Sequence, residues 1–385
     1  MSQKRILFVS GTRADFGKLK PLIERVKQSP EFQYSIFATG MHMLARYGST
    51  VHEITQAGFD KIFPYINQDG AINSQMDLVL ANTINGLGHY IREFSPDMVV
   101  IHGDRVETLA GAIAGALNNV LVAHVEGGEV SGTIDELLRH AVSKLSHLHF
   151  VSNDQARTRL IQMGEADESI FVVGSPDIDI MLSETLPSLA AVQERYEIPF
   201  DRYAIVTYHP VTSELPLLKG HIDEVLKGLQ AAGLNYVVIY PNNDTGGDII
   251  VDALSRFGGN PSVRVIPSMR FEYFLTLLKH ATAIVGNSSA GIREAPVYGV
   301  PTVNIGTRQM NRFEYSSILN VPEDAVAVAY AMTHLPQTVV PSRHFGSGDS
   351  ARRFMDELAR QRVWNTPRQK LFRDLRFPEA ASAAV

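Results

Sequence analysis

Short apolar runs rich in β-branched residues alternate with amphipathic segments along the first half of the chain. The runs predict buried strands at residues 5–10, 34–39, 97–101, 120–125, 147–151 and 170–173. Between them, residues 75–91 and 134–145 place apolar side chains at helical spacing. Because strands that alternate with helices usually pair in parallel, this pattern predicts a parallel sheet covered by helices.

The alternation is interrupted at residues 183–199, where Pro187 and Pro199 bracket a short charged segment. It then resumes, with strands predicted at residues 203–208, 235–240, 263–266, 283–286 and 302–305 and helices at 222–229 and 271–280. A chain of 385 residues also exceeds the usual length of one domain. We therefore predict an α/β protein with two Rossmann-like domains, residues 1–182 and 183–349, that face each other across a cleft.

The C-terminal part of the chain is polar. Residues 349–362 have a charged, helical pattern, and we expect a helix within residues 350–375 to pack back on the first domain. Residues 376–385 are rich in alanine and are expected to form a frayed tail.

Composition excludes several classes of function. The chain has 35 basic and 41 acidic residues, a net charge of −6, which offers no basic excess for nucleic acid or anionic lipid. It has no cysteine, which excludes disulfides, thiolate catalysis and cysteine-ligated metals within this chain. No stretch reaches the ~18 apolar residues of a membrane span, and residues 6–9 are too short for a secretory signal. We expect a cytoplasmic protein that contacts neither nucleic acid nor membrane.

Two turns that follow predicted strands have the composition of phosphate-binding loops. Residues 11–17 begin with Gly11 and lead into a predicted helix, whose N-terminal N–H groups favour an anion. Arg13 could bind phosphate with two donors, or it could pair with Asp15 at the surface. Residues 286–294 form a second turn, in which small residues let backbone N–H groups and hydroxyls approach a pyrophosphate. This turn supplies Ser288, Ser289 and Gly291. Glu294 follows at once, where a carboxylate can accept both ribose hydroxyls, which favours a nucleoside diphosphate over NAD.

Three carboxylates follow predicted strands of the first half: Asp104, Glu126 and Asp135. Carboxylates that share a cleft can have separated pKa values, so that one acts as an acid and another as a base or cation stabiliser. Asp135 could instead favour the helix dipole and pair with Arg139 four residues later. In the second half, His209 precedes Pro210, which ends a strand, so His209 should face the cleft and could neutralise a departing diphosphate.

A divalent metal is the alternative for the first-half cluster. His102 with Asp104, and His124 with Glu126, repeat a spacing of two residues that puts both side chains on one side of a strand. Both pairs lie where a strand gives way to a glycine turn, and no third pair completes a ligand set. We therefore assign no metal and no cofactor.

Ordered motifs over residues from about 4 to 375 resemble the hydrolysing UDP-N-acetylglucosamine 2-epimerases of bacterial sialic acid synthesis. The motifs are GTRADFGKLKPLI, TGMHM, IHGDRVETLAG, HVEGGEVSGTID, HPVT, YPNNDTG and VGNSSAGIREAP with the YGVP, VN and IGTRQ segments that follow. The resemblance implies a GT-B fold, in which two Rossmann-like domains hold the nucleotide between them. It also implies a homodimer, for which the sequence has no heptad seam.

The resemblance further implies conversion of UDP-N-acetylglucosamine and water into N-acetylmannosamine and UDP. The steps are anti elimination of UDP to 2-acetamidoglucal and then syn hydration. By resemblance, Arg13, His209, Ser288 and Ser289 take the phosphates, Glu294 the ribose and Phe271 the uracil. Asp104 and Glu126 correspond to the acid/base carboxylates of elimination, and Asp135 to the residue of hydration.

Three other activities and a catalytically silent sensor remain alternatives. Non-hydrolysing bacterial epimerases share the fold but usually carry a glutamine in a segment that binds a second, allosteric sugar nucleotide. Residues 39–42 are Thr-Gly-Met-His here, which favours hydrolysis. A sister group acts on UDP-2,4-diacetamido-2,4,6-trideoxyglucose for legionaminic acid, and no motif fixes the contacts at C4 and C6. A GT-B glycosyltransferase would use the same cleft, whereas a silent sugar-nucleotide sensor would not need the carboxylates.

Overall fold

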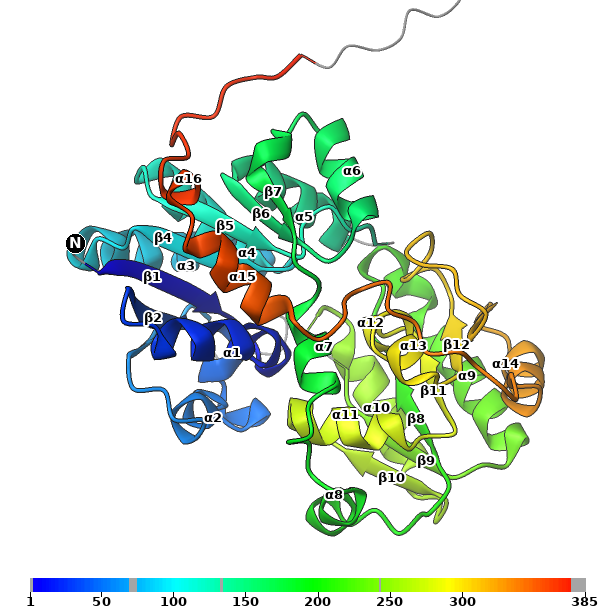
Figure 1. Ribbon diagram of the computed structural model, residues 1–385. Coiled ribbons are helices and arrows are strands. Elements are labelled where there is room, and N and C mark those ends of the chain that lie inside the picture. Colours follow the sequence, from blue (N-terminus) through cyan, green and yellow to red (C-terminus); the bar gives the residue numbers. More distant parts are fainter. Residues whose placement is uncertain (1–2, 69–74, 132–133, 242–243, 375–385) are drawn as a thin grey trace, which may run out of the picture.

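Two parallel β-sheets, each covered by helices, form the two halves of the molecule (Figure 1). The computed structural model describes residues 3–68, 75–131, 134–241 and 244–374. All strand pairs recorded among these residues are parallel, as the alternation of strands and helices predicts.

The first sheet has seven strands within the described part of the chain, in the order β3-β2-β1-β4-β5-β6-β7. Its strands are β1 (Lys4–Ser10), β2 (Phe32–Ala38), β3 (Ile62–Pro64), β4 (Met98–His102), β5 (Leu121–Val125), β6 (Leu148–Val151) and β7 (Ile170–Val172). Its helices are α1 (Arg13–Gln28), α2 (Val51–Gln56), α3 (Met76–Phe94), α4 (Val106–Leu117), α5 (Ile134–Leu145), α6 (Asp154–Gln162) and α7 (Pro176–Met181), with short 3₁₀ turns η1 (Gly40–Met43), η2 (Ala45–Tyr47) and η3 (Asp167–Ser169).

The strands of this sheet are buried on both faces. Along β1, Ile6 and Phe8 join the apolar cluster under α1, whereas Leu7 and Val9 join the cluster under α3 and α4. Successive side chains of a strand point to opposite faces, so a continuous apolar run is what a sheet between two helical layers requires.

The second sheet has the order β10-β9-β8-β11-β12-β13. Its strands are β8 (Ala204–Thr207), β9 (Tyr236–Ile239), β10 (Val263–Ile266), β11 (Ala283–Gly286), β12 (Thr302–Ile305) and β13 (Ile318–Val321). The helices of this half are α8 (Leu189–Tyr196), α9 (Leu218–Ala232), α10 (Gly247–Phe257), α11 (Phe271–Lys279), α12 (Ser289–Ile292), α13 (Ala295–Tyr298) and α14 (Ala325–Thr333), with η4 (Thr212–Leu217) between β8 and α9.

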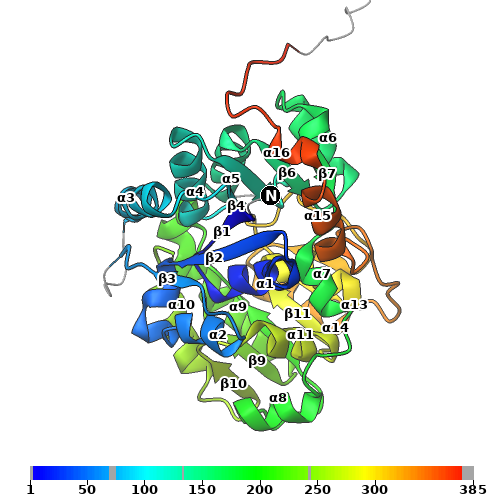
Figure 2. The ribbon, with the colours of Figure 1, turned by 60° about the vertical axis from the view of Figure 1, so that its left-hand side comes forward.

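After the second sheet the chain returns to the first half (Figures 1 and 2). The segment predicted as one helix forms two, α15 (Ser350–Leu358) and α16 (Gln361–Trp364). Phe354 and Leu358 are fully buried in the cluster that also holds Phe8, and the ring of Phe354 lies 4.6 Å from that of Phe150. Residues 376–385, expected to be frayed, lie outside the described residues.

Each predicted strand corresponds to an observed strand, but β3 and β13 were not predicted. Both are edge strands with mostly half-buried or exposed residues. Because an edge strand has one neighbour and little helical cover, its sequence need not contain the apolar run that marks the central strands.

Candidate active site

A cleft between the two halves is lined by nearly all of the candidate site residues. Several strands of each sheet end at this cleft, as expected for ligand sites in open parallel sheets. Lining residues from the prediction are Asp104, Glu126, Asp135, His209, Arg13, Phe271, Ser288, Ser289 and Glu294. The structure therefore brings together residues that lie almost 300 positions apart in the sequence.

Asn287 organises the second-half wall of the cleft. Its Oδ1 accepts a hydrogen bond from the His209 backbone N–H at 2.7 Å, and its Nδ2 donates to the His209 carbonyl at 2.9 Å. Just before it, Gly286 has a φ of 131°, and a Cβ there would lie 2.0 Å from the Thr207 carbonyl oxygen. Only glycine can bring β11 this close to the end of β8, and Asn287 then fixes the position of His209.

Ser288 caps α12, and its Oγ accepts a hydrogen bond from the backbone N–H of Ala290 at 3.3 Å. Gly291, predicted to approach a phosphate, packs against the sheet. A Cβ at Gly291 would lie 2.6 Å from Cγ2 of Thr302, whose hydroxyl donates to the Gly291 carbonyl at 2.7 Å. Gly291 is not among the described residues that line the cleft. Because it has no side chain, α12 can pack closely on β12.

Arg13 does not pair with Asp15. Its guanidinium donates to Ser268 Oγ of the second half and to Glu53 of α2, and so it bridges the halves at one edge of the cleft. Asp15 accepts hydrogen bonds from the Gly11 backbone N–H at 3.0 Å and from His102 Nδ1 at 2.9 Å. The alternative of a surface pair between Arg13 and Asp15 is therefore wrong.

Glu126 is surrounded by cations. Its Oε2 lies 3.0 Å from His102 Nε2 and 3.7 Å from Lys18 Nζ, and its Oε1 accepts a hydrogen bond from Arg293 at 2.7 Å. Burial alone would raise the pKa of Glu126, but Arg293, Lys18 and His102 outweigh it and hold the pKa well below its ordinary value. Its backbone adopts a left-handed φ of 62°, a conformation that costs a non-glycine residue about 1–3 kcal/mol. Glu126 is thus held ionised in a fixed, strained position.

His102 is a second charged member of this group, beside Glu126. Burial would lower the pKa of His102, but the adjacent carboxylates of Glu126 and Asp15 raise it to about 9. The imidazolium therefore lies between two carboxylates at neutral pH.

Asp104 and Asp135 each contact an arginine, but Arg139 contacts Asp104 and not Asp135. Arg139 is 2% exposed; its guanidinium contacts Asp104 and donates to the Glu126 carbonyl at 2.7 Å. Burial would raise the pKa of Asp104, but Arg139 and then Arg312 outweigh it, and the pKa lies below its ordinary value. Asp135 lies 3.5 Å from Arg308 Nη2 of the second half. The pairing of Asp135 with Arg139 is therefore wrong, and Asp135 faces the cleft.

The two pairs considered for a metal meet only through the contact of His102 with Glu126, because His124 and Asp104 have other partners. His124 Nδ1 lies 3.0 Å from Ser143 Oγ, and its Nε2 lies 2.8 Å from the Gly103 carbonyl oxygen. Burial lowers the pKa of His124 to about 3. This ring is fully buried beneath the cleft, while Asp104 is paired with Arg139.

Glu294 meets Lys18 in the cleft. Lys18 Nζ lies 3.3 Å from Glu294 Oε1 and 3.1 Å from Asp177 Oδ2, in addition to its contact with Glu126. Burial, followed by the charge of Asp177, raises the pKa of Glu294. One lysine of α1 thus joins carboxylates of both halves.

Comparisons with known proteins identify the family and the fold of the chain. A family model described as UDP-N-acetylglucosamine 2-epimerase matches residues 24–359. The chain belongs to this family. A protein of Neisseria meningitidis serogroup B named UDP-N-acetylglucosamine 2-epimerase is 46% identical, over 97% of this chain and 99% of that protein. A Legionella pneumophila protein named UDP-N,N'-diacetylbacillosamine 2-epimerase (hydrolyzing) is 35% identical, over 91% and 94%.

A solved structure of UDP-GlcNAc 2-epimerase from Neisseria meningitidis, bound to UDP-GlcNAc, superposes with a TM-score of 0.76. It is 19% identical, and the match covers 92% of this chain and 99% of that one. The predicted GT-B fold of two Rossmann-like domains is confirmed. Within the described part of this epimerase-family chain, we find no helix both long and apolar enough to cross a membrane.

Sequence reasoning missed several charged residues of the epimerase site. Lys18 and Arg293 lie inside quoted motifs, but their carboxylate partners are more than 100 residues away in the sequence and give no local signal. Glu129 and Arg312 likewise meet only in the folded chain, with 3.4 Å between Glu129 Oε2 and Arg312 Nη2. In a helical or turn sequence such residues look like ordinary surface charges.

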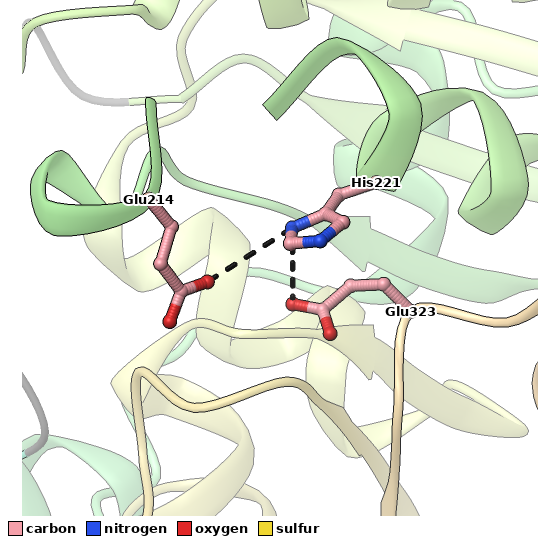
Figure 3. A group of neighbouring side chains, drawn as sticks. All are labelled: Glu214, His221 and Glu323. Carbon is pink, nitrogen blue, oxygen red and sulfur yellow. Dashed lines mark ion pairs between the residues drawn. The ribbon is translucent and has the colours of Figure 1, made fainter. Parts of the chain in front are cut away.

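A separate group of titratable side chains is formed by Glu214, His221 and Glu323 (Figure 3). His221 Nδ1 lies 3.9 Å from Glu214 Oε2 and 3.7 Å from Glu323 Oε1, a spacing that could also hold a metal ion. Glu214 accepts a hydrogen bond from Thr307 Oγ1 at 2.7 Å. This group therefore braces the loop that carries Arg308 to the cleft.

Proposed function

We propose that the chain is a hydrolysing UDP-N-acetylglucosamine 2-epimerase, which converts UDP-N-acetylglucosamine and water into N-acetylmannosamine and UDP for sialic acid synthesis. The observation that carries the proposal is the division of the cleft. Polar groups suited to a nucleoside diphosphate lie mainly on the second-half wall, and ionised carboxylates lie on the first-half wall. A UDP-sugar across the cleft would place its sugar carbons against the carboxylates.

The first step would break two bonds. The C1–O bond to UDP breaks with its electron pair on the diphosphate, and the C2 proton passes to a base, which leaves 2-acetamidoglucal. Arg13, His209, Ser288 and Ser289 would stabilise the leaving diphosphate through hydrogen bonds and charge. Asp104 and Glu126, both held ionised, can accept the proton or stabilise positive charge at C1.

The second step would add water to the glycal, with hydroxyl at C1 and a proton at C2. Proton delivery to the other face of C2 gives the manno configuration. We assign this step to Asp135, which lies at the cleft on the first turn of α5. Glu294 would bind the ribose and Phe271 the uracil; Glu294 must exchange its contact with Lys18 for the ribose hydroxyls.

The segment of residues 39–42 supports hydrolysis. His42 is fully buried, its Nε2 lies 3.0 Å from Ser10 Oγ, and its Nδ1 lies 2.7 Å from Thr50 Oγ1. Burial lowers the pKa of His42 to about 4, so the ring is neutral. Non-hydrolysing epimerases usually have a glutamine in this segment, where the chain has Met41, and this difference favours hydrolysis.

A second candidate substrate is the UDP-2,4-diacetamido-2,4,6-trideoxy sugar, as the name of the Legionella relative indicates. The two substrates differ at C4 and C6 of the sugar. Conversion of one and not the other distinguishes them.

Proton NMR of the purified protein with UDP-N-acetylglucosamine in deuterated water tests the proposal. Free N-acetylmannosamine with deuterium at C2 is expected. Formation of UDP-N-acetylmannosamine would show a non-hydrolysing epimerase, and unchanged substrate would lead to a trial of the diacetamido sugar nucleotide. Light scattering of the same sample tests the homodimer that the family resemblance implies.

A further inference from the structure

Arg293 reaches from the phosphate-binding turn of the second half into the carboxylate cluster of the first. It follows directly on α12, and it is 1% exposed. Its Nη2 donates to Glu126 Oε1 at 2.7 Å and to Ser175 Oγ at 2.6 Å, and its Nη1 contacts Glu129. Its guanidinium carbon lies 4.6 Å from the centre of the Phe345 ring. Both terminal nitrogens and one face of the guanidinium thus contact other parts of the chain, whereas Nε has no hydrogen-bond partner among the described residues.

Arg293 also connects the two roles proposed for the cleft. Ser288 and Ser289 precede it in the same turn, whereas its guanidinium contacts a carboxylate of the reaction. A flat guanidinium can bind Glu126 and Glu129 with separate nitrogens, which the single ammonium of lysine cannot reproduce.

We propose that Arg293 is a positioning residue of the epimerase reaction, which keeps Glu126 charged and at a fixed place relative to the phosphate-binding turn. The inference rests on the function proposed above. Arg293 acts through Glu126 and need not contact the substrate. Because a buried carboxylate without a cationic partner tends to take up a proton, loss of Arg293 would make Glu126 easier to protonate.

Other charged groups also face Glu126 and would remain in an Arg293 variant. Those facing its carboxylate or lying beside it are Lys18 from α1, His102 from β4, Arg139 from α5 at its backbone carbonyl, and Glu129 after β5. Lys18 and His102 would hold part of the charge, so the variant should shift the titration of Glu126 without abolishing its ionisation.

The test compares Arg293→Met and Arg293→Lys with the wild type and with Arg157→Met, a control at the exposed Arg157–Asp167 pair. Activity is measured against pH, and UDP affinity is measured by calorimetry. We expect Arg293→Met to lower kcat about a hundredfold and to move the acid limb of the pH profile to higher pH. Arg293→Lys should leave the acid limb close to that of the wild type, with a smaller loss of kcat. UDP affinity should change by less than about threefold, and Arg157→Met should match the wild type.

A wild-type acid limb in Arg293→Met, with kcat reduced only in proportion to the unfolded fraction, would overturn the inference. If Arg293→Met does not fold, Ser175→Ala replaces it, because Ser175 bonds both Arg293 and Glu126. A small shift of the acid limb in the same direction supports the inference, and no shift contradicts it.

A readout without substrate separates this inference from the proposed function. Carbon-13 NMR of labelled glutamate carboxyls, assigned with Glu126→Gln, follows the ionisation of Glu126 directly. An inactive wild type would contradict the proposed function alone. If the Glu126 carboxyl ionises over the same pH range in the wild type and in the Arg293 or Ser175 variant, the role of Arg293 is contradicted.

Discussion

The two walls of the cleft are built by different physical means. The first-half wall is electrostatic: Glu126, Asp104 and Asp15 are each in contact with a cationic side chain. The second-half wall is built by backbone: Gly286 brings two strands together, and Asn287 hydrogen-bonds both the N–H and the carbonyl of His209. The difference suggests that changes on the first wall alter chemistry and its pH dependence, whereas changes on the second alter nucleotide affinity.

Glu126→Gln tests the first wall most severely. The amide keeps the shape but removes the charge that Arg293, Lys18 and His102 surround. We expect kcat to fall roughly 10²–10⁴-fold, the range typical of a lost acid/base group, while UDP affinity changes little. The exposed Glu168→Gln is the matched control and should leave kcat unchanged. Comparable losses of UDP affinity and kcat would contradict the division between the walls.

Asp135→Asn separates the two chemical steps on the same wall. If Asp135 serves hydration, elimination should continue and 2-acetamidoglucal should accumulate, with net formation of N-acetylmannosamine reduced about a hundredfold. Proton NMR of the reaction mixture measures both products. Equal slowing of UDP release and sugar formation would remove Asp135 from the hydration step.

Asn287→Ala tests the second wall. Loss of its amide leaves the His209 N–H and carbonyl without these partners, at a cost of about 1–3 kcal/mol. If this displaces His209 and the turn, UDP should bind about tenfold to a hundredfold more weakly by calorimetry. Asn304→Ala is the control, since Asn304 bonds Asn320 on neighbouring strands of the same sheet. A loss of UDP affinity in both variants would reflect general destabilisation.

Gly291→Ala decides between packing and binding at that position. The added methyl would lie 2.6 Å from Thr302 Cγ2, and overpacking of this kind typically costs about 1–3 kcal/mol of unfolding free energy. Urea unfolding should show this loss, and a second change, Thr302→Ser, should recover part of it. Calorimetry should give a UDP affinity within about twofold of the wild type. A tenfold weaker affinity without lower stability would support the predicted phosphate contact.

His102 supplies the smallest expected effect, a pH dependence of stability. Its pKa is raised from 6.5 to about 9 in the folded protein. The stabilisation is therefore complete below about pH 6.5 and is lost as the pH rises through about 9. The difference in unfolding free energy between the wild type and His102→Gln should be larger at pH 6 than at pH 10. An equal difference at both values would show that His102 is not charged in the fold.

The contrast between the walls also explains how much could be predicted from the sequence. Central strands such as β11 and β12 have the predicted bounds, since an apolar run between turns is a local signal. Most of the cleft residues follow such strands directly. Arg293 and Lys18 could not be predicted, because they contact carboxylates that lie far away in the sequence. The same limit applies to Gly291, whose environment is set by Thr302 of the next strand.

The central claim is that one cleft performs elimination and hydration in sequence. The most direct measurement supplies the wild-type protein with 2-acetamidoglucal in the presence of UDP and follows the sugar by proton NMR. The account predicts conversion of the glycal into N-acetylmannosamine. Persistence of the glycal, under conditions in which the same protein consumes UDP-N-acetylglucosamine, would contradict it.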